Sequence, residues 1–517
     1  MSSTYNQRAF AFLEAPQNGD KPTARVPFVN GDNSVGDKDR AFHNWYRFVL
    51  SYPPHLVRDY LHDFALNGES VVLDPFCGTG TTVVEARLNH IASIGIEANP
   101  FPHFASKTKV NWAVDPDKLD ELAGEVAQTT YQALLAQGID DKSLYCSSEL
   151  TLQRLSEQAE RALIRDSISP LPLHKSLVLL EQINRHKTRP GYDNARLALG
   201  NALVTNIGNL RFGPEVGVGK KKADVPVVAA WLHEMRKMAD DLRTLQGGSQ
   251  PEATVLLGDA RNIAQLLQPN SVDAVITSPP YPNEKDYTRT TRLESVILGF
   301  FPDMLELRHN KKRLLRSNTR GVYKLDTDDR WVADNPEIQQ LAERIENRRI
   351  ELGKTSGFEK LYARVTRLYF GGMARHLSEL RAVLKPGAKL AYVVGDQASY
   401  LRVLIRTGQL LAQIAEELGY EVERIDLFRT RFATATQSEL REEVVVLRWP
   451  GERRRPIALQ FTAEERVSLL EMAVIEESDM LTLNVVDQKT YQLVPRADIS
   501  TAELSALKES ETRYSPA

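Results

Sequence analysis

The segment Ser278-Pro279-Pro280-Tyr281 carries residue types suited to chemistry on an aromatic amine. Such an amine is a weak nucleophile because its lone pair is delocalised into the ring. The Ser278 hydroxyl and the Pro279 carbonyl could accept the amino hydrogens, turn the lone pair towards an electrophile and stabilise the developing positive charge. The Tyr281 ring offers a stacking face for a base that has left its duplex. A proline-rich surface turn is the plainer interpretation.

A glycine-rich turn, Asp-Pro-Phe-Cys-Gly-Thr-Gly at 74–80, is the second candidate site. Glycine lets the backbone approach a ligand closely because it has no Cβ and accepts positive φ. Glu97 follows the turn by about 20 residues, where a carboxylate can accept hydrogen bonds from both ribose hydroxyls of an adenosine cofactor. Val83 stands where a nicotinamide-binding turn has its third glycine. The turn alone leaves a methyl donor and a dinucleotide equally open.

The chain contains two cysteines, Cys77 and Cys146. This number excludes a disulfide framework and a cysteine-rich zinc site, and we expect no metal. Neither cysteine follows a proline, the context that a cysteine nucleophile attacking cytosine C5 would have. Cys77 is therefore interpreted as a small buried filler.

Short apolar runs predict the elements that position both candidate sites. Strands are expected at 70–73, 92–96, 254–257, 272–277, 389–394, 424–428 and 443–448, and a helix at 81–89. Their alternation with helical segments predicts an open, largely parallel α/β sheet. The glycine turn and Ser278 to Tyr281 then follow two of its strands, at the edge where ligands bind in such folds.

The remaining sequence divides by composition. We expect a leader at 1–40, a catalytic core at 41–110 and 250–450, a helical insertion at 111–249, a basic insertion within the core at 283–385 and a C-terminal extension at 451–517. The stretch 43–60 should end in a helix that Pro53 and Pro54 begin. The extension is charged and helical in pattern, with one hairpin expected near 481–494.

Composition limits the partners and the compartment. The net charge of −3 and the apolar content of 42% fit a globular protein that is not basic overall, so a nucleic-acid surface must be local. No apolar run approaches the roughly 20 residues of a membrane helix, and no secretory signal is visible. We therefore expect a cytoplasmic, nucleoid-associated protein without a membrane partner.

Two basic stretches are candidates for contact with nucleic acid. From Lys285 to Lys324 there are ten Lys and Arg residues against four Asp and Glu residues, which suits phosphate binding beside the reacting base. A glycine-rich basic loop at 211–222 lies between predicted helices. A solvated helix face and an ordinary exposed loop are the plainer interpretations. The candidate DNA contacts are Arg289, Arg292, Lys311, Lys312, Arg313, Lys220 and Lys221.

Together these motifs resemble the amino-methyltransferase family of DNA modification enzymes, which make N4-methylcytosine or N6-methyladenine. The run at 74–82 resembles the family's cofactor motif, 277–281 its catalytic motif, 257–260 its third-strand motif and 384–387 the turn before its fifth strand. The segment 43–56 resembles the one that closes over the methionine end of the donor. The cofactor motif comes before the catalytic motif, an order that fits two subgroups of the family. The gap of about 200 residues between these two motifs fits neither subgroup well.

The resemblance implies an α/β class I S-adenosylmethionine-dependent methyltransferase fold, a Rossmann-like, mostly parallel seven-stranded sheet with a reversed last hairpin. The implied cofactor is S-adenosyl-L-methionine. The implied catalytic residues are Ser278, Pro279, Pro280 and Tyr281, and the implied cofactor-binding residues are Asp74, Phe76, Gly78, Gly80, Thr81, Thr82, Glu97, Asp259 and Ala260.

The function that follows is methylation of the exocyclic amine of a flipped base in double-stranded DNA. Serine at the first motif position resembles the cytosine-N4 branch. Adenine-N6 methylation of DNA, methylation of an RNA base amine and a catalytically silent DNA-recognition subunit are the alternatives. A restriction-modification or phage-defence setting, with a cognate nuclease or defence proteins as partners, is expected. The insertion at 111–249 is the candidate DNA-recognition region.

Overall fold

The computed structural model describes residues 39–46, 51–146, 150–212, 216–245, 250–283, 285–433, 438–451, 481–487 and 490–495. Nearly all of the expected leader lies outside these ranges, as does the C-terminal extension apart from its hairpin. That hairpin is confirmed: β12 (Leu481–Asp487) pairs antiparallel with β13 (Thr490–Pro495).

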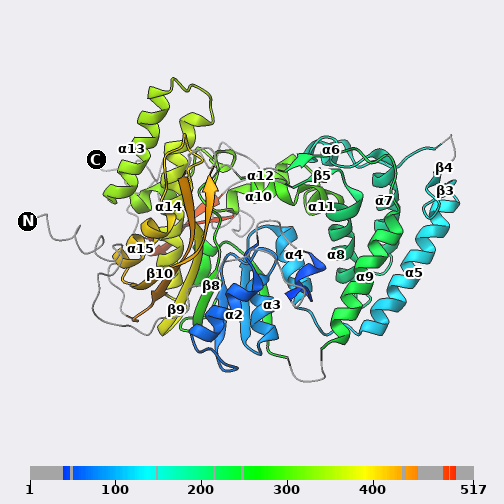
Figure 1. Cartoon of the computed structure of the whole chain (residues 1–517), viewed down its shortest axis with the longest axis horizontal. Coiled ribbons are helices and arrows are strands. Elements are labelled where there is room, and N and C mark those ends of the chain that lie inside the picture. Colours follow the sequence, from blue (N-terminus) through cyan, green and yellow to red (C-terminus); the bar gives the residue numbers. More distant parts are fainter. Residues whose placement is uncertain are drawn as a thin grey trace, which may run out of the picture.

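A seven-stranded sheet forms the centre of the fold, in the order β10-β11-β9-β8-β1-β2-β7. Neighbouring strands from β7 to β9 pair in parallel, whereas β11 is antiparallel to both β9 and β10. This is the expected mostly parallel sheet with a reversed last hairpin, so the class I methyltransferase fold is confirmed (Figure 1). The strands are β1 (Val71–Asp74), β2 (Ala92–Glu97), β7 (Ala253–Leu257), β8 (Val272–Thr277), β9 (Leu384–Gly395), β10 (Glu421–Ala433) and β11 (Ser438–Arg448).

Helices cover both faces of this sheet because alternate strand residues point to opposite sides. On one face, Leu73 and Val275 pack in a core with α13 (Pro336–Glu351), α14 (Tyr362–Leu380) and α15 (Thr407–Glu417). On the other, Val72 and Ala274 pack with α2 (Pro54–Asp63) and with Ala86 of α3 (Thr81–Leu88). Pro54 begins α2, as expected. A strand buried on both faces explains the continuous apolar runs in the sequence.

The expected helical insertion is present between β2 and β7. It extends from the sheet as an arm (Figure 1). Its apolar residues share one core with Phe101 and Phe104 of α4 (Pro100–Lys109), so the arm packs directly on the sheet domain. Two short ribbons, β3–β4 (139–140 and 145–146) and β5–β6 (210–211 and 217–218), were not expected. The helices are α5 (Pro116–Leu135), α6 (Glu157–Ala162), α7 (Pro170–Asn184), α8 (Tyr192–Ala202) and α9 (Val227–Arg243), with a π-helical turn at Leu203–Ile207.

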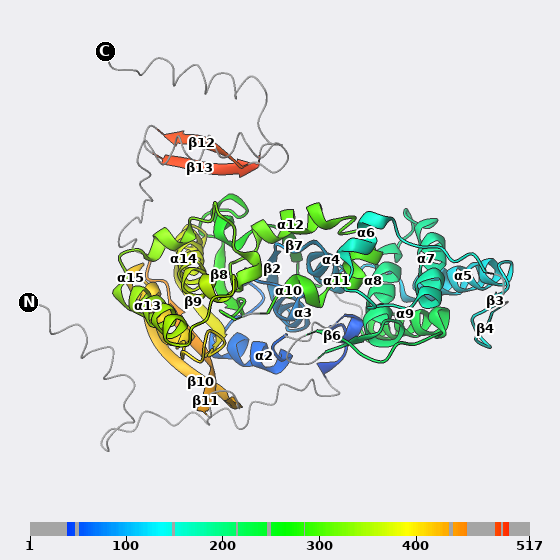
Figure 2. The same ribbon diagram turned by 90° about the horizontal axis from the view of Figure 1, so that it is seen from above.

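The second insertion joins β8 to β9, and its α13 and α14 lie beside the sheet near β9 (Figure 2). It contains α10 (Tyr287–Thr290), α11 (Arg292–Ile297) and α12 (Met304–Arg313) before α13 and α14. Short 3-10 helices lie at His43–Trp45, Ala260–Gln265, Thr319–Gly321, Asp328–Val332 and Glu359–Leu361. In the part of the chain described above, no helix combines the length and the apolar character needed to cross a bilayer.

Candidate functional site

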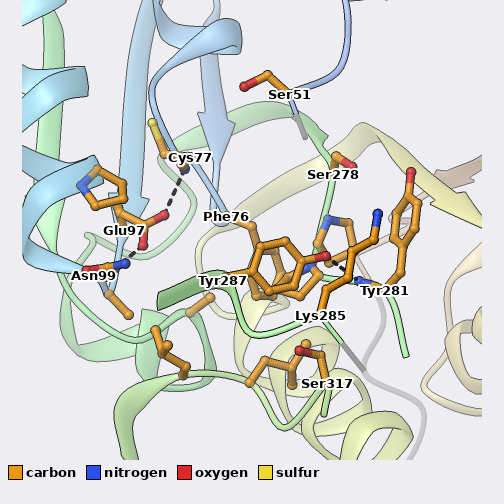
Figure 3. A pocket seen from close by; sticks show the side chains of 18 of the residues that line it. Ser51, Phe76, Cys77, Glu97, Asn99, Ser278, Tyr281, Lys285, Tyr287 and Ser317 are labelled. Carbon is orange, nitrogen blue, oxygen red and sulfur yellow. Dashed lines mark hydrogen bonds between the residues drawn. The ribbon is translucent and has the colours of Figure 1, made fainter. Parts of the chain in front are cut away.

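A cavity of about 590 Å³ opens at the carboxyl edge of the sheet, where β1, β2 and β8 end. The glycine turn and the Ser278 to Tyr281 segment, about 200 residues apart in the sequence, line the same cavity (Figure 3). Of the residues expected at the site, those that line it are Phe76, Gly78, Thr81, Glu97, Asp259, Ala260, Ser278, Pro279, Pro280 and Tyr281.

The glycine turn requires glycine at two positions. Gly78 has φ +52° and Gly80 has φ +88°, both in the left-handed region that side chains disfavour. A Cβ on Gly80 would also stand 2.9 Å from Cβ of Ser106 in α4, whereas nothing lies within 4 Å of a Cβ on Gly78. Gly80 therefore serves the packing of the turn against α4, and Gly78 faces open space at the cavity.

Glu97, at the end of β2, is fixed by backbone donors. Its Oε2 accepts from Gly78 N at 2.8 Å and its Oε1 from Asn99 N at 2.7 Å. Burial raises the pKa of Glu97 to about 7, against the lowering effect of these two hydrogen bonds. Each carboxylate oxygen keeps acceptor capacity towards the cavity, as expected of a ribose-binding acid.

Asp74 lies behind the cavity wall and does not line it. Its fully buried carboxylate accepts from the Thr277 hydroxyl at 2.6 Å, the Tyr52 hydroxyl at 3.0 Å and Phe76 N at 3.1 Å. Burial raises its pKa to about 6. Thr82, also behind the wall, hydrogen-bonds the Tyr52 hydroxyl and donates to the Ile276 carbonyl at 3.0 Å. These contacts join the glycine turn, the segment before β1 and the residue that precedes Ser278.

The Ser278 hydroxyl donates to the Val393 carbonyl of β9 at 3.1 Å. This bond occupies its proton, so the oxygen lone pairs are what Ser278 can offer to a ligand. Pro279 and Pro280 have no N–H, and the next donor, Tyr281 N, is bound by the Tyr287 hydroxyl at 3.3 Å. Tyr287 also lines the cavity (Figure 3). The motif at 278–281 gave no indication that Tyr287 belongs to the site, and the structure adds it.

Asp259 follows β7 and forms a charged network with Arg261. Its carboxylate accepts from Arg261 Nε at 3.0 Å and Nη2 at 2.6 Å, and Arg261 Nη1 donates to Asp328 at 2.5 Å. Burial alone would raise the pKa of Asp259, but the Arg261 charge holds it below its ordinary value. Asp259 therefore remains an anionic acceptor at the cavity, and Arg261 links it to the second insertion.

The wall opposite the glycine turn comes from β10 and β11, which sequence reasoning did not assign to the site. Phe428, Arg429, Arg431 and Glu442 line the cavity. The register shifts between Leu427 and Arg429, so Phe428 is an extra residue in β10. Such a bulge redirects a side chain, here towards the cavity. Nothing in the sequence indicates this bulge.

The expected DNA contacts occupy different environments. Lys311 and Arg313 line the cavity, and Lys311 pairs with Asp286 at 2.6 Å. Arg292 is only 9% exposed and donates to the Thr288 and Ala162 carbonyls inside the protein. Our expectation of a surface contact is wrong for Arg292 because its guanidinium holds α10 and α6 together.

The other four basic residues lie at or near the surface. Lys312 lies 5.7 Å from the centre of the Tyr323 ring, and Arg289 donates to the Val216 carbonyl. Lys220 and Lys221 are exposed, and Lys221 pairs with Asp166 at 3.1 Å. Across the ranges that the structure covers, no group of three or more His, Cys, Asp or Glu side chains could hold a metal ion.

This chain is similar to a family model and to known Type II methyltransferases. A family model described as DNA methylase matches residues 18–105. The chain is 27% identical over 437 residues to the Type II methyltransferase M.BsoBI of Geobacillus stearothermophilus, covering 78% of this chain and 83% of that protein. It is 23% identical over 420 residues to the Type II methyltransferase M.AvaI of Nostoc sp., with the same two shares.

Among solved structures, TrmN from Thermus thermophilus matches 79% of this chain at 11% identity, with a TM-score of 0.27. This chain spans about half of that structure, 52%. A TM-score this low carries no argument about fold or function.

Proposed function

Because the chain belongs to the DNA amino-methyltransferase family, we propose that it transfers a methyl group from S-adenosylmethionine to the N4 amine of a flipped cytosine in double-stranded DNA. The observation that carries this proposal is that the glycine turn and Ser278 to Tyr281 line one cavity. A ligand in contact with Glu97 and a base in contact with Tyr281 would then share one space, and bringing the two reactants together supplies much of the rate.

The residues around Glu97 fit the methyl donor. The cavity volume of about 590 Å³ lies within the range of small-molecule sites. Glu97 would accept from the ribose hydroxyls, Gly78 leaves room for the ligand, and Asp259 would accept from the adenine amine. When bound, S-adenosylmethionine supplies an electrophilic methyl group. Ser51 and Tyr52 line the same cavity and suit the methionine end.

The acceptors of the Ser278 segment fit the amine. The Ser278 hydroxyl proton is held by the Val393 carbonyl, so its oxygen would accept one amino hydrogen. The Pro279 carbonyl would accept the other, which turns the amine lone pair out of conjugation with the ring. Both oxygens would also stabilise the positive charge that forms on nitrogen. The Tyr287 hydroxyl holds the turn through Tyr281 N, so the acceptors are in position before the base arrives.

We propose cytosine rather than adenine as the target because of the residue at the first position of the catalytic motif. Serine at the first motif position resembles the cytosine-N4 branch of the family, whereas the adenine branch usually has Asp or Asn there. The hydroxyl of Ser278 is a neutral acceptor, which suffices for a geometry in which two oxygens share the two amino hydrogens.

The DNA would be recognised outside the cavity. We keep the helical insertion at 111–249 as the proposed recognition region and 41–110 with 250–450 as the catalytic core. The relatives are Type II methyltransferases, so a restriction-modification setting with a cognate nuclease belongs to the same proposal. Methylation would protect the recognition sequence from that nuclease.

A transfer assay tests the substrate class. The full-length protein is incubated with donor labelled in the methyl group and with either unmethylated duplex DNA or bulk RNA. We expect label in DNA only, and none with a Gly78→Asp variant, whose carboxylate would occupy the space beside Glu97. The proposal would be contradicted if label appeared only in RNA. It would also be contradicted if folded protein that binds the donor left the DNA unlabelled.

A further inference from the structure

The wall that β10 and β11 contribute to the cavity carries two arginines and one glutamate. Arg429 and Arg431 of β10 and Glu442 of β11 line the cavity. The register places Arg429 opposite Glu442, and Arg431 is two residues further along β10. Because alternate strand residues point to opposite faces, both arginines are on the face that carries Glu442. The proposed methyl transfer uses none of these three side chains.

Glu442 joins the two guanidinium groups. Its Oε2 accepts from Arg429 Nε at 2.5 Å, and its Oε1 lies 3.7 Å from Arg431 Nε. Arg431 also donates through Nη2 to the Asp396 carbonyl at 3.2 Å. Two cations share one anion, so the three side chains together carry one excess positive charge. A guanidinium has five N–H donors, so Arg431, whose side chain is 42% exposed, keeps donors for an anion in the cavity.

The arginine pair is at the opposite end of the sheet from the residue proposed to hold the donor ribose. Glu97 ends β2, and Figure 3 shows it on one side of the cavity with Ser278 on the other. In the order β10-β11-β9-β8-β1-β2, five spacings of about 4.8 Å separate β2 from β10, roughly 24 Å in all. The arginine pair is therefore on the substrate side of the cavity, beyond Ser278 as seen from Glu97.

The proposed stacking ring lies between Ser278 and the arginine pair. The Tyr281 ring packs on Gly395 of β9, where a Cβ would be 3.0 Å from Cε2 of the ring. The same Cβ would be 3.3 Å from Cγ of Glu442, so the ring and the glutamate are neighbours. A base stacked on Tyr281 would therefore have the arginine pair beside it, on the side away from the donor.

The chemistry of a nucleotide indicates which of its groups would meet the arginines. In cytosine the amine is on C4 and the glycosidic bond is on N1, which is opposite C4 in the ring. An amine held at Ser278 and turned towards the donor therefore places the deoxyribose and its phosphates on the far side of the base. In adenine, too, the amine and the glycosidic bond are at opposite ends of the base. A phosphate is an anion whose oxygens match the guanidinium donors.

We propose that Arg431, joined to Arg429 through Glu442, binds a backbone phosphate of the extruded nucleotide and so positions its base. The proposal rests on the proposed function, because it requires a DNA substrate with an extruded base. It holds for cytosine and for adenine alike. A fixed phosphate restrains the nucleotide before the reaction, which lowers the entropic cost of bringing its amine to the methyl group.

The first test compares Arg431→Met with Arg448→Met over a range of salt concentrations. Arg448 is the matched control, because its side chain is 44% exposed and pairs with Glu421 at the other end of the same hairpin. We expect Arg431→Met to lower kcat/KM for duplex DNA about tenfold and its slope against salt, on logarithmic axes, by about one. Arg448→Met should stay within about twofold of the wild type. Tm and donor affinity should not change, and a weaker affinity for the donor in Arg431→Met would instead assign the arginine to the donor carboxylate, contrary to the proposal.

Modified DNA identifies the phosphate. Once the methylated position has been mapped, the phosphate on either side of that nucleotide is replaced by an uncharged methylphosphonate, in two separate duplexes. One of the two replacements should lower kcat/KM of the wild type about tenfold. The same replacement should lower kcat/KM of Arg431→Met by no more than about twofold, because the contact that it removes is already absent from the variant.

Two results would overturn the proposal. The first is a wild-type protein whose activity neither methylphosphonate lowers. The second is a pair of losses that multiply, so that Arg431→Met on the modified duplex is about 100-fold below the wild type on unmodified DNA, which would mean that the arginine and the phosphate act independently. A wild-type protein that does not methylate any DNA would instead overturn the proposed function.

Discussion

Replacement of Glu97 by glutamine should weaken binding of the methyl donor by roughly 30- to 1000-fold. Glu97 receives Gly78 N on one oxygen and Asn99 N on the other, at 2.8 and 2.7 Å. Glutamine has one oxygen, so its amide nitrogen would face one of these N–H groups. The glutamine can also accept from only one ribose hydroxyl, and without a charge, so one charge-assisted hydrogen bond to the donor is lost and the other is weakened, a cost of about 2–4 kcal/mol to donor binding. The same change removes the charge that would accept the ribose hydroxyls.

The pH dependence of donor binding tests the same residue. Burial raises the pKa of Glu97 to about 7. If binding requires the carboxylate, the ionised fraction falls from about 0.9 at pH 8 to about 0.1 at pH 6, so affinity should fall about tenfold. Glu97→Gln should bind weakly with little pH dependence. Burial raises the pKa of Asp74 to about 6, and Asp74 is unchanged in this variant. Any small pH dependence that Asp74 contributes to donor binding is therefore still measured in the variant.

Isothermal titration calorimetry with the donor at pH 6, 7 and 8 measures both effects. Glu69→Gln is the matched control, because Glu69 lies on the exposed turn before β1. The control should bind as the wild type does at each pH. A Glu97→Gln variant that binds the donor within threefold of the wild type, or that keeps the tenfold pH effect, would refute the assignment of Glu97.

Three further predictions follow from the site. Ser278→Ala should lower kcat by about 10²–10³ while donor affinity stays within twofold, because Ser278 bonds Val393 and not the glycine turn. Single-turnover rates and a parallel donor titration measure both quantities, and an equal loss of donor binding would contradict the prediction. Arg261→Met should destabilise the protein by about 3–5 kcal/mol in urea unfolding, because Asp259 and Asp328 lose their shared cation, and a change below 1 kcal/mol would contradict this. The donor-free protein should lose stability as pH rises from 5 to 8, because the folded-state pKa values of Asp74, Glu97 and Glu294 are raised to about 6, 7 and 8; a Tm that rises over this range would be inconsistent.

Most of the sheet could be predicted from the sequence because its strands are short, apolar and buried on both faces. The strand expected at 272–277 has the bounds of β8, and the glycine turn follows β1 as expected. The extra length of β9, β10 and β11 could not be predicted, because their outer ends alternate polar and apolar residues or carry charge, and their pairing depends on distant partners.

The candidate site could be predicted only where a motif marks it. Asp74 belongs to the cofactor motif, yet it lies behind the wall because Thr277 and Tyr52 bind it there. Arg292 lies in a basic stretch, yet it is buried because α6 of the distant first insertion packs against α11. Phe428 and Tyr287 reach the cavity through a bulge and an insertion. Each of these placements is decided by tertiary contacts that residue type and spacing do not encode.

The identity of the methylated nucleoside tests the central claim most directly. Unmethylated duplex DNA is incubated with S-adenosylmethionine and either the wild-type protein or Ser278→Ala, then digested to nucleosides and analysed by mass spectrometry. We predict N4-methyl-2′-deoxycytidine from the wild type and a loss of at least 100-fold in the variant. N6-methyl-2′-deoxyadenosine in its place would contradict the choice of cytosine, and DNA without any methylated amine would contradict the account as a whole.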